Sequence, residues 1–317
     1  MNATTEPTTP SGAVGSVVPR LLAVHAHPDD ETLATGALIS TWAAAGLPVT
    51  LVTCTRGERG EVIGAELAHL EGDGPALAAH REGELAAALS ALGVVDHVFL
   101  DRAIGLDGPR LEDSGMAWLS TGQAGSTGAV PAGAFVATPV DEAAARLATV
   151  LRERRPDVVV TYEPGGGYGH PDHVRAHDVT MRAVELSGLA PVVLWAAVES
   201  RALRAGLRAL EPVDGLALPD PDGPLPSAAV PAEEIALVVD VPPVLERVLG
   251  ALRAHATQVQ AVARIESAAA VGQYALSNSL LAPVLPEESY RLASGRRDAI
   301  DWPTGVRPAV SAHGHAG

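Results

Sequence analysis

The feature that most constrains the fold is a regular alternation of short apolar runs with longer amphipathic segments along residues 20–200. Short apolar runs predict buried strands, whereas apolar residues spaced three or four apart predict helices. The pattern predicts strands over residues 21–25, 49–54, 95–100, 158–162 and 192–196, and helices over residues 31–45, 75–92, 140–154 and 174–186. Strands that alternate with helices usually pair in parallel. We therefore predict an α/β fold with a mostly parallel, Rossmann-like sheet and helices on both faces.

Two segments interrupt this alternation. Residues 102–139 are rich in Gly, Ser and Asp, and because a connection of that length is more often functional than idle, they are a candidate lid or substrate-recognition loop. Residues 211–231 are dense in Pro, Asp and Gly and mark a boundary, after which a strand over 235–241 and a helix over 244–263 are predicted. We therefore expect a disordered lead-in at 1–19, an α/β domain at 20–210, and a smaller C-terminal subdomain with a tail at 211–317.

Charge and composition exclude several classes of protein. The formal net charge is −16 and no basic stripe appears, which argues against a nucleic-acid partner because such binding rests on clustered Lys and Arg. All 22 basic residues are Arg, so no lysine is available for a Schiff base or a phosphate loop. No apolar run approaches the roughly 20 residues that span a bilayer, and the N-terminus lacks the basic start and apolar run of a signal peptide. We expect a soluble, cytoplasmic protein without a membrane partner.

The first of two histidine-containing clusters follows the strand predicted at 21–25. It consists, in order, of His27, Pro28, Asp29, Asp30 and Glu31. Proline suits the first position of a helix, and the helix dipole favours acidic residues in the first turn. Helix capping is therefore as good an explanation of this cluster, taken alone, as a functional site.

The second cluster follows the strand predicted at 158–162 and contains glycines, Tyr168, His170, Asp172 and His173. Open α/β sheets bind ligands at the carboxyl ends of their strands, so both clusters are expected at one edge of the sheet. A catalytic zinc takes three protein ligands from His and carboxylates and keeps one position open. Since the single Cys54 excludes a multi-cysteine site, His, Asp or Glu must hold any metal. The two clusters together predict a metal-dependent hydrolase, with zinc or iron as the metal.

Other polar residues near the clusters have simpler explanations. His177 follows the second cluster at the spacing of zinc-binding helices, but we expect a surface or supporting residue. His25 is expected to be a buried structural histidine, and Cys54 a small buried hydrophobe. A solvated loop surface is as good an explanation as substrate contact for Glu58 and Glu61.

Four segments, in the same order along the chain, resemble the LmbE-like zinc N-deacetylase family. They are residues 24–31, 53–64, 113–116 and 166–173, and the resemblance covers residues 20–194. Within the family the segments are most similar to members that remove acetate from N-acetylglucosaminyl-inositol in mycothiol biosynthesis. The resemblance implies a zinc-dependent amidohydrolase with one zinc ion per subunit and a small glucosaminyl-inositol substrate. Nothing in the sequence indicates the oligomeric state.

The resemblance also implies roles for individual residues. Asp29 would be the general base that takes a proton from the attacking water. Tyr168 and His170 would stabilise the tetrahedral oxyanion, and His170 is also a candidate to protonate the departing amine. From the residues themselves, we expect Asp172 to support the second cluster through hydrogen bonds and not to coordinate the metal. The zinc ligands would be His27, Asp30 and His173.

Three further residues match substrate-contacting positions of the family. Arg81 and Asp113 match positions that hold sugar and inositol hydroxyls, and Met116 matches a wall of the site. From the residues alone, a solvated helix residue is a stronger explanation of Arg81, and a turn acid is a stronger explanation of Asp113.

Two other functions are compatible with the same sequence. A mycothiol S-conjugate amidase would use the same zinc chemistry to cleave an amide between glucosamine and a larger cysteinyl group. A catalytically inactive, metal-dependent sugar-binding module would keep the ligands but lack a base. The presence of ligand candidates, base and oxyanion donors together argues against the inactive module.

Overall fold

The strands predicted along residues 20–200 pair into one central sheet. The computed structural model describes residues 18–103, 109–120, 123–125 and 130–309. Its parallel strands lie in the order β3-β2-β1-β6-β7, so the order reverses between β1 and β6. Their bounds are β1 Leu21–His25, β2 Val49–Thr53, β3 Asp96–Phe99, β6 Val158–Tyr162 and β7 Val192–Glu199. All residues of β1, β2 and β6 are buried, as expected for parallel strands covered on both faces.

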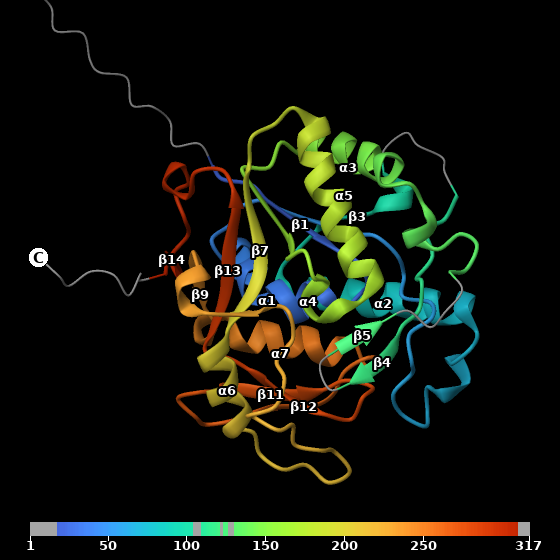
Figure 1. Cartoon of the computed structure of the whole chain (residues 1–317), viewed down its shortest axis with the longest axis vertical. Helices are drawn as coiled ribbons and strands as arrows, with labels where there is room; N and C mark the ends of the chain where they lie inside the picture. Colours follow the sequence, from blue (N-terminus) through green and yellow to red (C-terminus); the bar gives the residue numbers. More distant parts are fainter. Residues whose placement is uncertain (1–17, 104–108, 121–122, 126–129, 310–317) are drawn as a thin grey trace, which may run out of the picture.

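The C-terminal third of the chain extends this sheet beyond β7 (Figure 1). Strand β13 (Glu287–Ser294) pairs antiparallel with β7 and with β9 (Leu237–Asp240), which in turn pairs with β14 (Val306–Pro308). The short β8 (Ala229–Val230) pairs with β7. The predicted domain boundary after residue 210 stays a prediction, but strands from both sides of it hydrogen-bond within one sheet. Most of the lead-in predicted at 1–19 lies outside the described residues.

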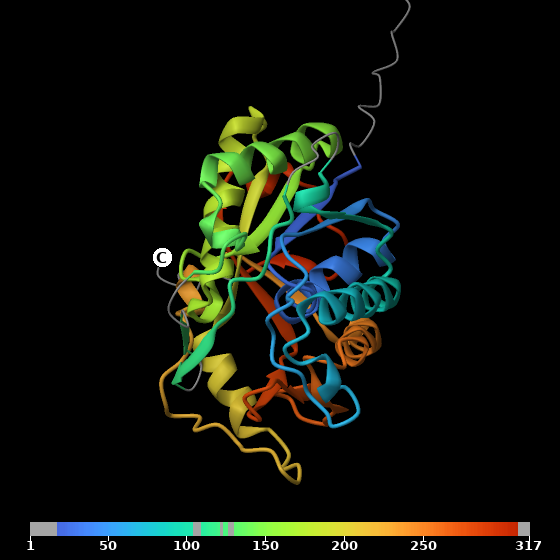
Figure 2. The same ribbon diagram turned by 90° about the vertical axis from the view of Figure 1, so that its right-hand side faces the viewer.

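Helices cover both faces of the sheet, as predicted (Figure 2). The alternating side chains of β1 explain this, because Leu21 and Ala23 point into one apolar cluster and Leu22 and Val24 into the other. On the first face lie α1 (Asp30–Ala44), α2 (Gly74–Leu92) and α7 (Leu245–Ala254); on the second lie α3 (Val140–Arg154) and α5 (Pro171–Ser187).

The helix ends follow from local sequence. Helix α2 begins after Asp73, whose carboxylate accepts the N–H of Ala76, and ends before Gly93 in the left-handed conformation. Helix α5 begins at Pro171, a residue suited to the first helical position, and ends before Gly188, also left-handed. These signals place the start of α5 beside the second histidine cluster.

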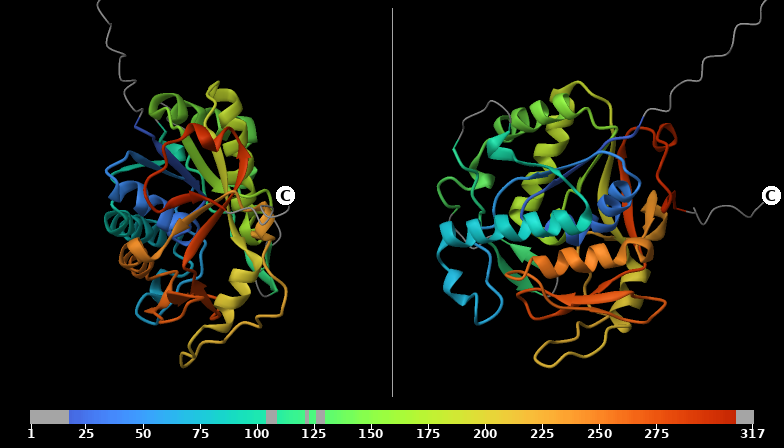
Figure 3. Two further views of the ribbon diagram at one scale, coloured as in Figure 1. Left: turned by 90° about the vertical axis from the view of Figure 1, so that its left-hand side faces the viewer. Right: turned by 180° about the vertical axis from the view of Figure 1, so that it is seen from behind.

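A smaller antiparallel sheet lies beside α7 and α6 (Ser200–Arg208), and the view from behind shows it below the paired helices α2 and α7 (Figure 3). Part of the predicted loop 102–139 forms a hairpin, β4 (Ala117–Ser120) with β5 (Gln123–Gly125). Residues 104–108, 121–122 and 126–129 of this loop lie outside the described residues. The small sheet consists of β10 Gln260–Arg264, β11 Gly272–Ala275 and β12 Leu281–Val284.

The helix predicted over 244–263 is wrong in its second half. Helix α7 ends at Ala254, and Gln260 already belongs to strand β10. The chain turns because the next polar groups bond to other elements: His255 to Glu31 of α1, and the Thr257 N–H to Glu84 of α2 at 2.7 Å. Tertiary contacts override local helix propensity here.

The reversal of strand order between β1 and β6 places both histidine clusters in one crevice. Open α/β sheets bind ligands at this point, outside the carboxyl ends of the strands. The first cluster leaves the end of β1 and the second leaves the end of β6. Among the described residues, no helix has the length and apolar character required to cross a membrane.

Candidate metal centre and active site

The three predicted metal ligands meet at the carboxyl ends of β1 and β6. His27 follows β1, Asp30 opens α1, and His173 lies in the first turn of α5; all three are buried. His27 Nδ1 lies 3.2 Å from Asp30 Oδ2, and His173 Nε2 lies 3.2 Å from Asp30 Oδ1. The two imidazole nitrogens are 3.3 Å apart. The three side chains therefore form a compact triangle of possible ligand atoms.

The hydrogen bonds of the two imidazoles fix which nitrogens face this triangle with lone pairs. His27 Nε2 lies 3.2 Å from Asp172 Oδ2, and His173 Nδ1 lies 3.0 Å from the Gly166 carbonyl oxygen. Because carboxylate and carbonyl oxygens only accept, these two nitrogens carry the hydrogens of neutral imidazoles. The lone pairs of His27 Nδ1 and His173 Nε2 then face each other beside the Asp30 carboxylate.

This donor set fits a divalent cation. Ligands about 2.0–2.1 Å from a tetrahedral zinc stand about 3.3 Å from one another, which matches the 3.2–3.3 Å edges of the triangle. Without a cation the inward lone pairs and the carboxylate repel one another. A carboxylate that accepts from the outer nitrogen of a ligand histidine, as Asp172 does for His27, is the usual support of such a ligand.

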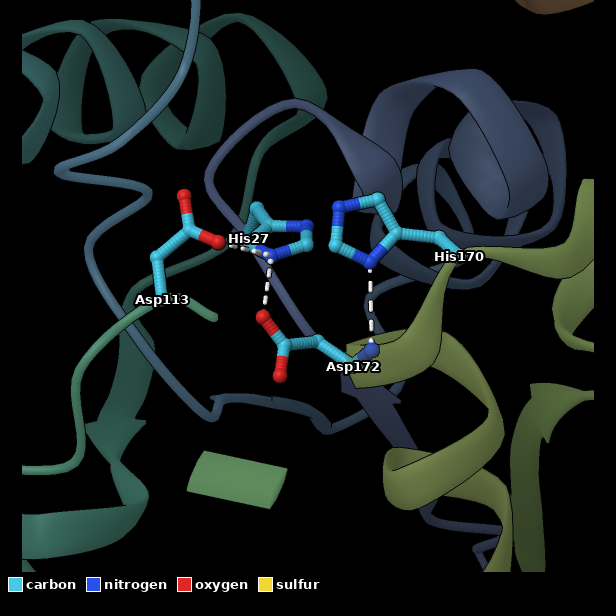
Figure 4. A group of neighbouring side chains, drawn as sticks. All are labelled: His27, Asp113, His170 and Asp172. Carbon is cyan, nitrogen blue, oxygen red and sulfur yellow. Dashed lines mark hydrogen bonds and ion pairs between the residues drawn. The ribbon is translucent and has the colours of Figure 1, made fainter. Parts of the chain in front are cut away.

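A second group of buried side chains shares His27 with the first and contains Asp113, His170 and Asp172 (Figure 4). Here hydrogen bonds use most of the acceptors: His170 Nδ1 accepts the N–H of Asp172 at 3.1 Å, and Asp172 Oδ2 accepts from Ser114 N at 2.8 Å, while Asp172 Oδ1 has no partner among the described residues. His27 Nε2 lies 3.6 Å from Asp113 Oδ1. We therefore interpret this group as a support for His27 and not as a second metal site.

Asp29 stands between the two ligands of the first cluster in a strained conformation. Its φ of 117° is rare for a residue with a side chain and costs about 1–3 kcal/mol. Its carbonyl accepts the N–H groups of Thr32 and Leu33 at 2.9 Å, and its own N–H donates to Glu31 Oε2 at 2.9 Å. Helix α1 begins at Asp30 and not at Pro28, and the Asp29 side chain makes no capping bond. Capping alone therefore does not explain the acidic cluster.

The carboxylate of Asp29 is set up to exchange protons near neutral pH. Burial raises the pKa of Asp29 to about 7; the Arg81 guanidinium opposes this rise and the Asp30 carboxylate adds to it. Arg81 Nη2 lies 3.4 Å from Asp29 Oδ2. A general base works best when its pKa is close to the working pH.

Charges around the ligands favour a bound cation. Burial lowers the pKa of His27, but the carboxylates of Asp113, Asp172 and Asp30 outweigh it and raise that pKa well above its ordinary value. Burial raises the pKa of Asp30, but the imidazoles of His173 and His27 reverse the effect and hold it well below its ordinary value. The negative charge of the carboxylates around His27 attracts a proton to this imidazole, and the same charge would attract a metal ion.

Tyr168 and His170 flank the triangle on the α5 side. Burial raises the pKa of the Tyr168 phenol well above its ordinary value, so this side chain stays an O–H donor. Burial and the imidazoles of His27 and His173 lower the pKa of His170 well below its ordinary value. Because His170 Nδ1 accepts from Asp172 N, a neutral His170 carries its hydrogen on Nε2. Both residues can donate hydrogen bonds without a net charge.

One small cavity of about 80 Å³ brings together the predicted base, oxyanion donors and substrate residues Arg81, Asp113 and Met116. Arg81 is only 2% exposed, so its interpretation as a solvated helix residue is wrong. Its guanidinium donates to the carbonyls of Gly57 at 2.7 Å and Pro28 at 2.5 Å. Arg81 thereby fixes the loops on both sides of the cavity.

Asp113 is both a turn acid and a lining residue of this cavity. Its Oδ1 accepts the N–H of Gly115 at 2.8 Å, and its Oδ2 accepts the N–H of Arg59 at 3.2 Å. The side chain is 3% exposed and also faces His27. The two interpretations of Asp113 are therefore compatible.

A second, largely apolar cavity of about 390 Å³ adjoins the ligand triangle. Its lining includes Asp30 and His173 together with Tyr168, which also lines the small cavity. The remaining wall comes largely from residues of β7, β12 and the surrounding helices. A group larger than acetyl therefore has space beside the ligands.

The structure also shows where the other polar residues near the two clusters lie. His25 is buried and pairs with the Thr35 hydroxyl at 2.9 Å, and Cys54 is buried, as predicted. His177 is not at the surface: it is buried, with Nδ1 2.9 Å from the Tyr162 carbonyl, outside both clusters. Glu58 accepts the N–H of Asp113 at 3.3 Å, so it holds the cavity wall. Glu61 lines the small cavity.

Sequence reasoning missed three buried residues around the site. Tyr162, the last residue of β6, stacks on the His173 ring at 4.2 Å and accepts the N–H of Ala26. Glu163 accepts the N–H groups of Gly165 and Gly167, which shapes the glycine loop. His255 bonds to Glu31 from the C-terminal third. Tyr162 had a local signal as an aromatic residue at a strand end before the second cluster, and His255 lies in a segment, residues 252–259, that resembles the family more weakly.

Comparison with known proteins adds an independent observation. Residues 22–184 match the family described as PIG-L: GlcNAc-PI de-N-acetylase. A protein of Kineococcus radiotolerans called 1D-myo-inositol 2-acetamido-2-deoxy-alpha-D-glucopyranoside deacetylase is 49% identical over 289 residues, which cover 87% of this chain and 78% of that protein. A protein of Saccharopolyspora erythraea called 1D-myo-inositol 2-acetamido-2-deoxy-alpha-D-glucopyranoside deacetylase 1 is 46% identical over 89% of this chain and 92% of its own length.

Solved structures are also similar to this chain. The N,N'-diacetylchitobiose deacetylase from Pyrococcus horikoshii matches with 21% identity and a TM-score of 0.46, over 74% of this chain and 69% of its own.

Proposed function

Because the chain belongs to the PIG-L family of GlcNAc-PI de-N-acetylases, we propose that it hydrolyses the acetamide of 1D-myo-inositol 2-acetamido-2-deoxy-alpha-D-glucopyranoside. The products are the free amine and acetate, as expected for a step of mycothiol biosynthesis. Relatives named for this reaction match nearly nine tenths of the chain. The single structural observation that supports the proposal best is the triangle of His27, Asp30 and His173 beside the strained Asp29.

Zinc is the metal that we propose for this triangle, with Fe²⁺ as the alternative. Two histidines and a carboxylate suit both ions, and the 3.2–3.3 Å edges suit a tetrahedral site. A bound zinc would act as a Lewis acid that activates water and polarises the acetamide carbonyl. The remaining steps depend on side chains of the protein.

Asp29 takes the proton from the attacking water as the new C–O bond forms at the carbonyl carbon. Its pKa of about 7, which burial raises, suits this exchange near neutral pH. When the C–N bond of the tetrahedral species breaks, the departing amine needs one proton, and Asp29 holds the one taken from water. Burial holds the pKa of His170 low, which makes it the less suitable acid.

Tyr168 and His170 stabilise the negative oxygen that forms during the attack. Each presents a neutral donor beside the ligand triangle, and donors preset around a developing oxyanion typically contribute about 10²–10³-fold in turnover. Asp113 accepts from sugar hydroxyls, Arg81 keeps the base and the loop after β2 in place, and Met116 supplies an apolar wall. These groups hold the acetamide close to Asp29.

The test compares two substrates on one preparation. Primary-amine release is measured from the acetamido-glucosyl inositol and from a mycothiol S-conjugate, using metal-stripped protein with and without added zinc. Zinc-restored release mainly from the acetylated sugar supports the proposal. Release mainly from the conjugate would change the assignment to the amidase. No amine release from either substrate would overturn the proposal.

Asp29→Ala separates catalysis from metal binding. We expect turnover to fall to near background because no other described carboxylate shares the position of Asp29, while zinc content stays at the wild-type value. Metal analysis and kcat are measured on the same sample. Persisting activity would exclude Asp29 as the base and would favour another route for the proton.

A mycothiol S-conjugate amidase is the second candidate, and one observation favours it. The apolar cavity of about 390 Å³ beside Asp30, His173 and Tyr168 is much larger than an acetyl methyl requires. The substrate comparison above decides between the two reactions. For either one we propose a small-molecule substrate and a cytoplasmic setting, with which the single, buried Cys54 is compatible.

A further inference from the structure

A buried carboxylate joins Asp29 to the C-terminal third of the chain. Glu31 and His255 are both 0% exposed. Glu31 Oε2 accepts the N–H of Asp29 at 2.9 Å, and Glu31 Oε1 accepts from His255 Nε2 at 2.8 Å. The Thr32 hydroxyl donates to the same Oε1 at 2.5 Å. The two oxygens of one side chain therefore connect the backbone of Asp29 to a histidine 224 residues away from Glu31.

This connection acts where the backbone is strained. Asp29 has φ of 117°, and such a conformation persists only when the surroundings hold it. Its carbonyl is held by the first turn of α1, and Arg81 holds the carbonyl of Pro28 before it. The Asp29 N–H has the Glu31 carboxylate as its partner. A glutamate side chain rotates about several bonds, so its Oε2 stays in place only if its Oε1 is also fixed.

His255 is well placed to fix it. The residue ends α7, and the turn that follows is anchored to α2 because the Thr257 N–H and hydroxyl both donate to Glu84, at 2.7 and 2.6 Å. Nδ1 of His255 is buried and has no hydrogen-bond partner among the described residues, so the Glu31 contact is the polar function of this imidazole. A buried histidine kept for stability alone would cost less as an apolar residue.

We propose that His255 is a positioning residue for the general base: through Glu31 it holds Asp29 in the strained, positive-φ conformation that directs its carboxylate into the cavity. The proposal rests on the proposed function to the extent that Asp29 is the base of that reaction. His255 itself touches neither the ligand atoms nor the small cavity.

Two matched substitutions test this proposal. Asparagine and glutamine carry the same amide, but the glutamine amide nitrogen reaches the position of His255 Nε2, whereas that of asparagine stops near Nδ1. We expect His255→Asn to lower kcat by about 10- to 10²-fold, the size expected when a reacting group is displaced by about an ångström. His255→Gln should restore kcat to within about threefold of wild type. KM and zinc content should stay unchanged in both.

Thr257→Val is the control for a purely structural effect. It removes a buried hydrogen bond to Glu84 in the same turn but leaves the Glu31 contact in place. We expect a lower melting temperature with kcat close to wild type. If Thr257→Val lowers kcat as much as His255→Asn does, the effect comes from general loosening of the turn, and the proposal is overturned.

A second background isolates the action on Asp29. In an Asp29→Ala chain, His255→Asn should lower the residual rate no further, because the group that it positions is gone. An additional drop of the same size as in the native background would overturn the proposal. So would equal loss of kcat in His255→Asn and His255→Gln, or loss of zinc in His255→Asn.

Two measurements keep the test decisive. If His255→Asn does not fold, Glu31→Ala replaces it, since it removes the carboxylate that accepts from both Asp29 and His255; an unchanged kcat would overturn the proposal. If the native protein does not cleave the acetamido sugar, the proposed function fails separately. Crystal structures of the His255 variants then decide. The φ of Asp29 should depart from 117° in the asparagine variant and should stay near 117° in the glutamine variant.

Discussion

His27 belongs to two groups of side chains that have almost the same composition but different hydrogen-bond partners. On its Nδ1 side, His27 faces Asp30 and His173, and Nδ1, His173 Nε2 and the two Asp30 oxygens lie together as possible ligand atoms. On its Nε2 side, the second group contains Asp113, His170 and Asp172. Backbone N–H groups or His27 bond to most of their acceptors, whereas Asp172 Oδ1 is buried with no hydrogen-bond partner among the described residues. We therefore expect a cation in the first group and interpret the second group, in which hydrogen bonds take most of the acceptors, as a support for His27.

The difference shows that residue types and spacing do not define a metal centre. Both groups contain buried His and Asp within ligand distance of one another. What separates them is which nitrogen of each imidazole carries the hydrogen, and this depends on an outer acceptor such as the Gly166 carbonyl or Asp172. We therefore expect the hydrogen-bond network around the histidines to decide which of them bind a metal.

The largest effect should come from removing a ligand of the first group. His173→Ala is expected to lose the metal and to reduce turnover to background, because two ligands hold a divalent ion poorly. Metal content after dialysis and amine release are measured together. His177→Ala is the matched control from the same helix and should keep both. Full metal content in His173→Ala would break the distinction between the two groups.

Removing His170, the proposed oxyanion donor of the second group, should affect catalysis and spare the metal. His170→Ala is expected to lower kcat by about 10²–10³-fold, the usual cost of one oxyanion donor, with zinc content unchanged. The measurement is kcat at saturating zinc beside metal analysis of the same protein. If zinc content falls as it does in His173→Ala, the second group also binds metal.

The smallest effect should come from the support of His27. Asp172→Asn keeps the shape of the side chain but weakens the acceptor for His27 Nε2, which lies 3.2 Å away. We expect metal affinity to fall by about 10–10²-fold, with much of kcat recovered at saturating zinc. A competition titration against a chelator measures the affinity. An unchanged affinity would show that Asp172 does not support the ligand.

Much of the fold and of the site could be predicted from local sequence. The apolar runs and the Gly and Pro signals gave α3 and β6 with their observed bounds and the other early elements within a few residues. The rule for open α/β sheets then placed both clusters at one edge, where the structure has them. The comparisons confirm the family resemblance, which rested on four segments.

What could not be predicted depends on contacts between distant segments. The helix expected over 244–263 ends early because His255 and Thr257 bond to α1 and α2, and no local pattern carries that information. The strained φ of Asp29 and the burial of Arg81 are likewise properties of the assembled crevice. The roles assigned to individual residues stay predictions until the variants above are measured.

The dependence of Asp29 on His255 has a consequence for synthesis of the protein. A ribosome produces the chain from its N-terminus, so all three proposed ligands emerge with His173, well before His255. A nascent chain therefore carries its complete metal-binding set while the segment that positions the base is still unmade. If the proposal holds, a chain that ends before residue 255 would contain the three proposed ligands but lack the imidazole that positions Asp29.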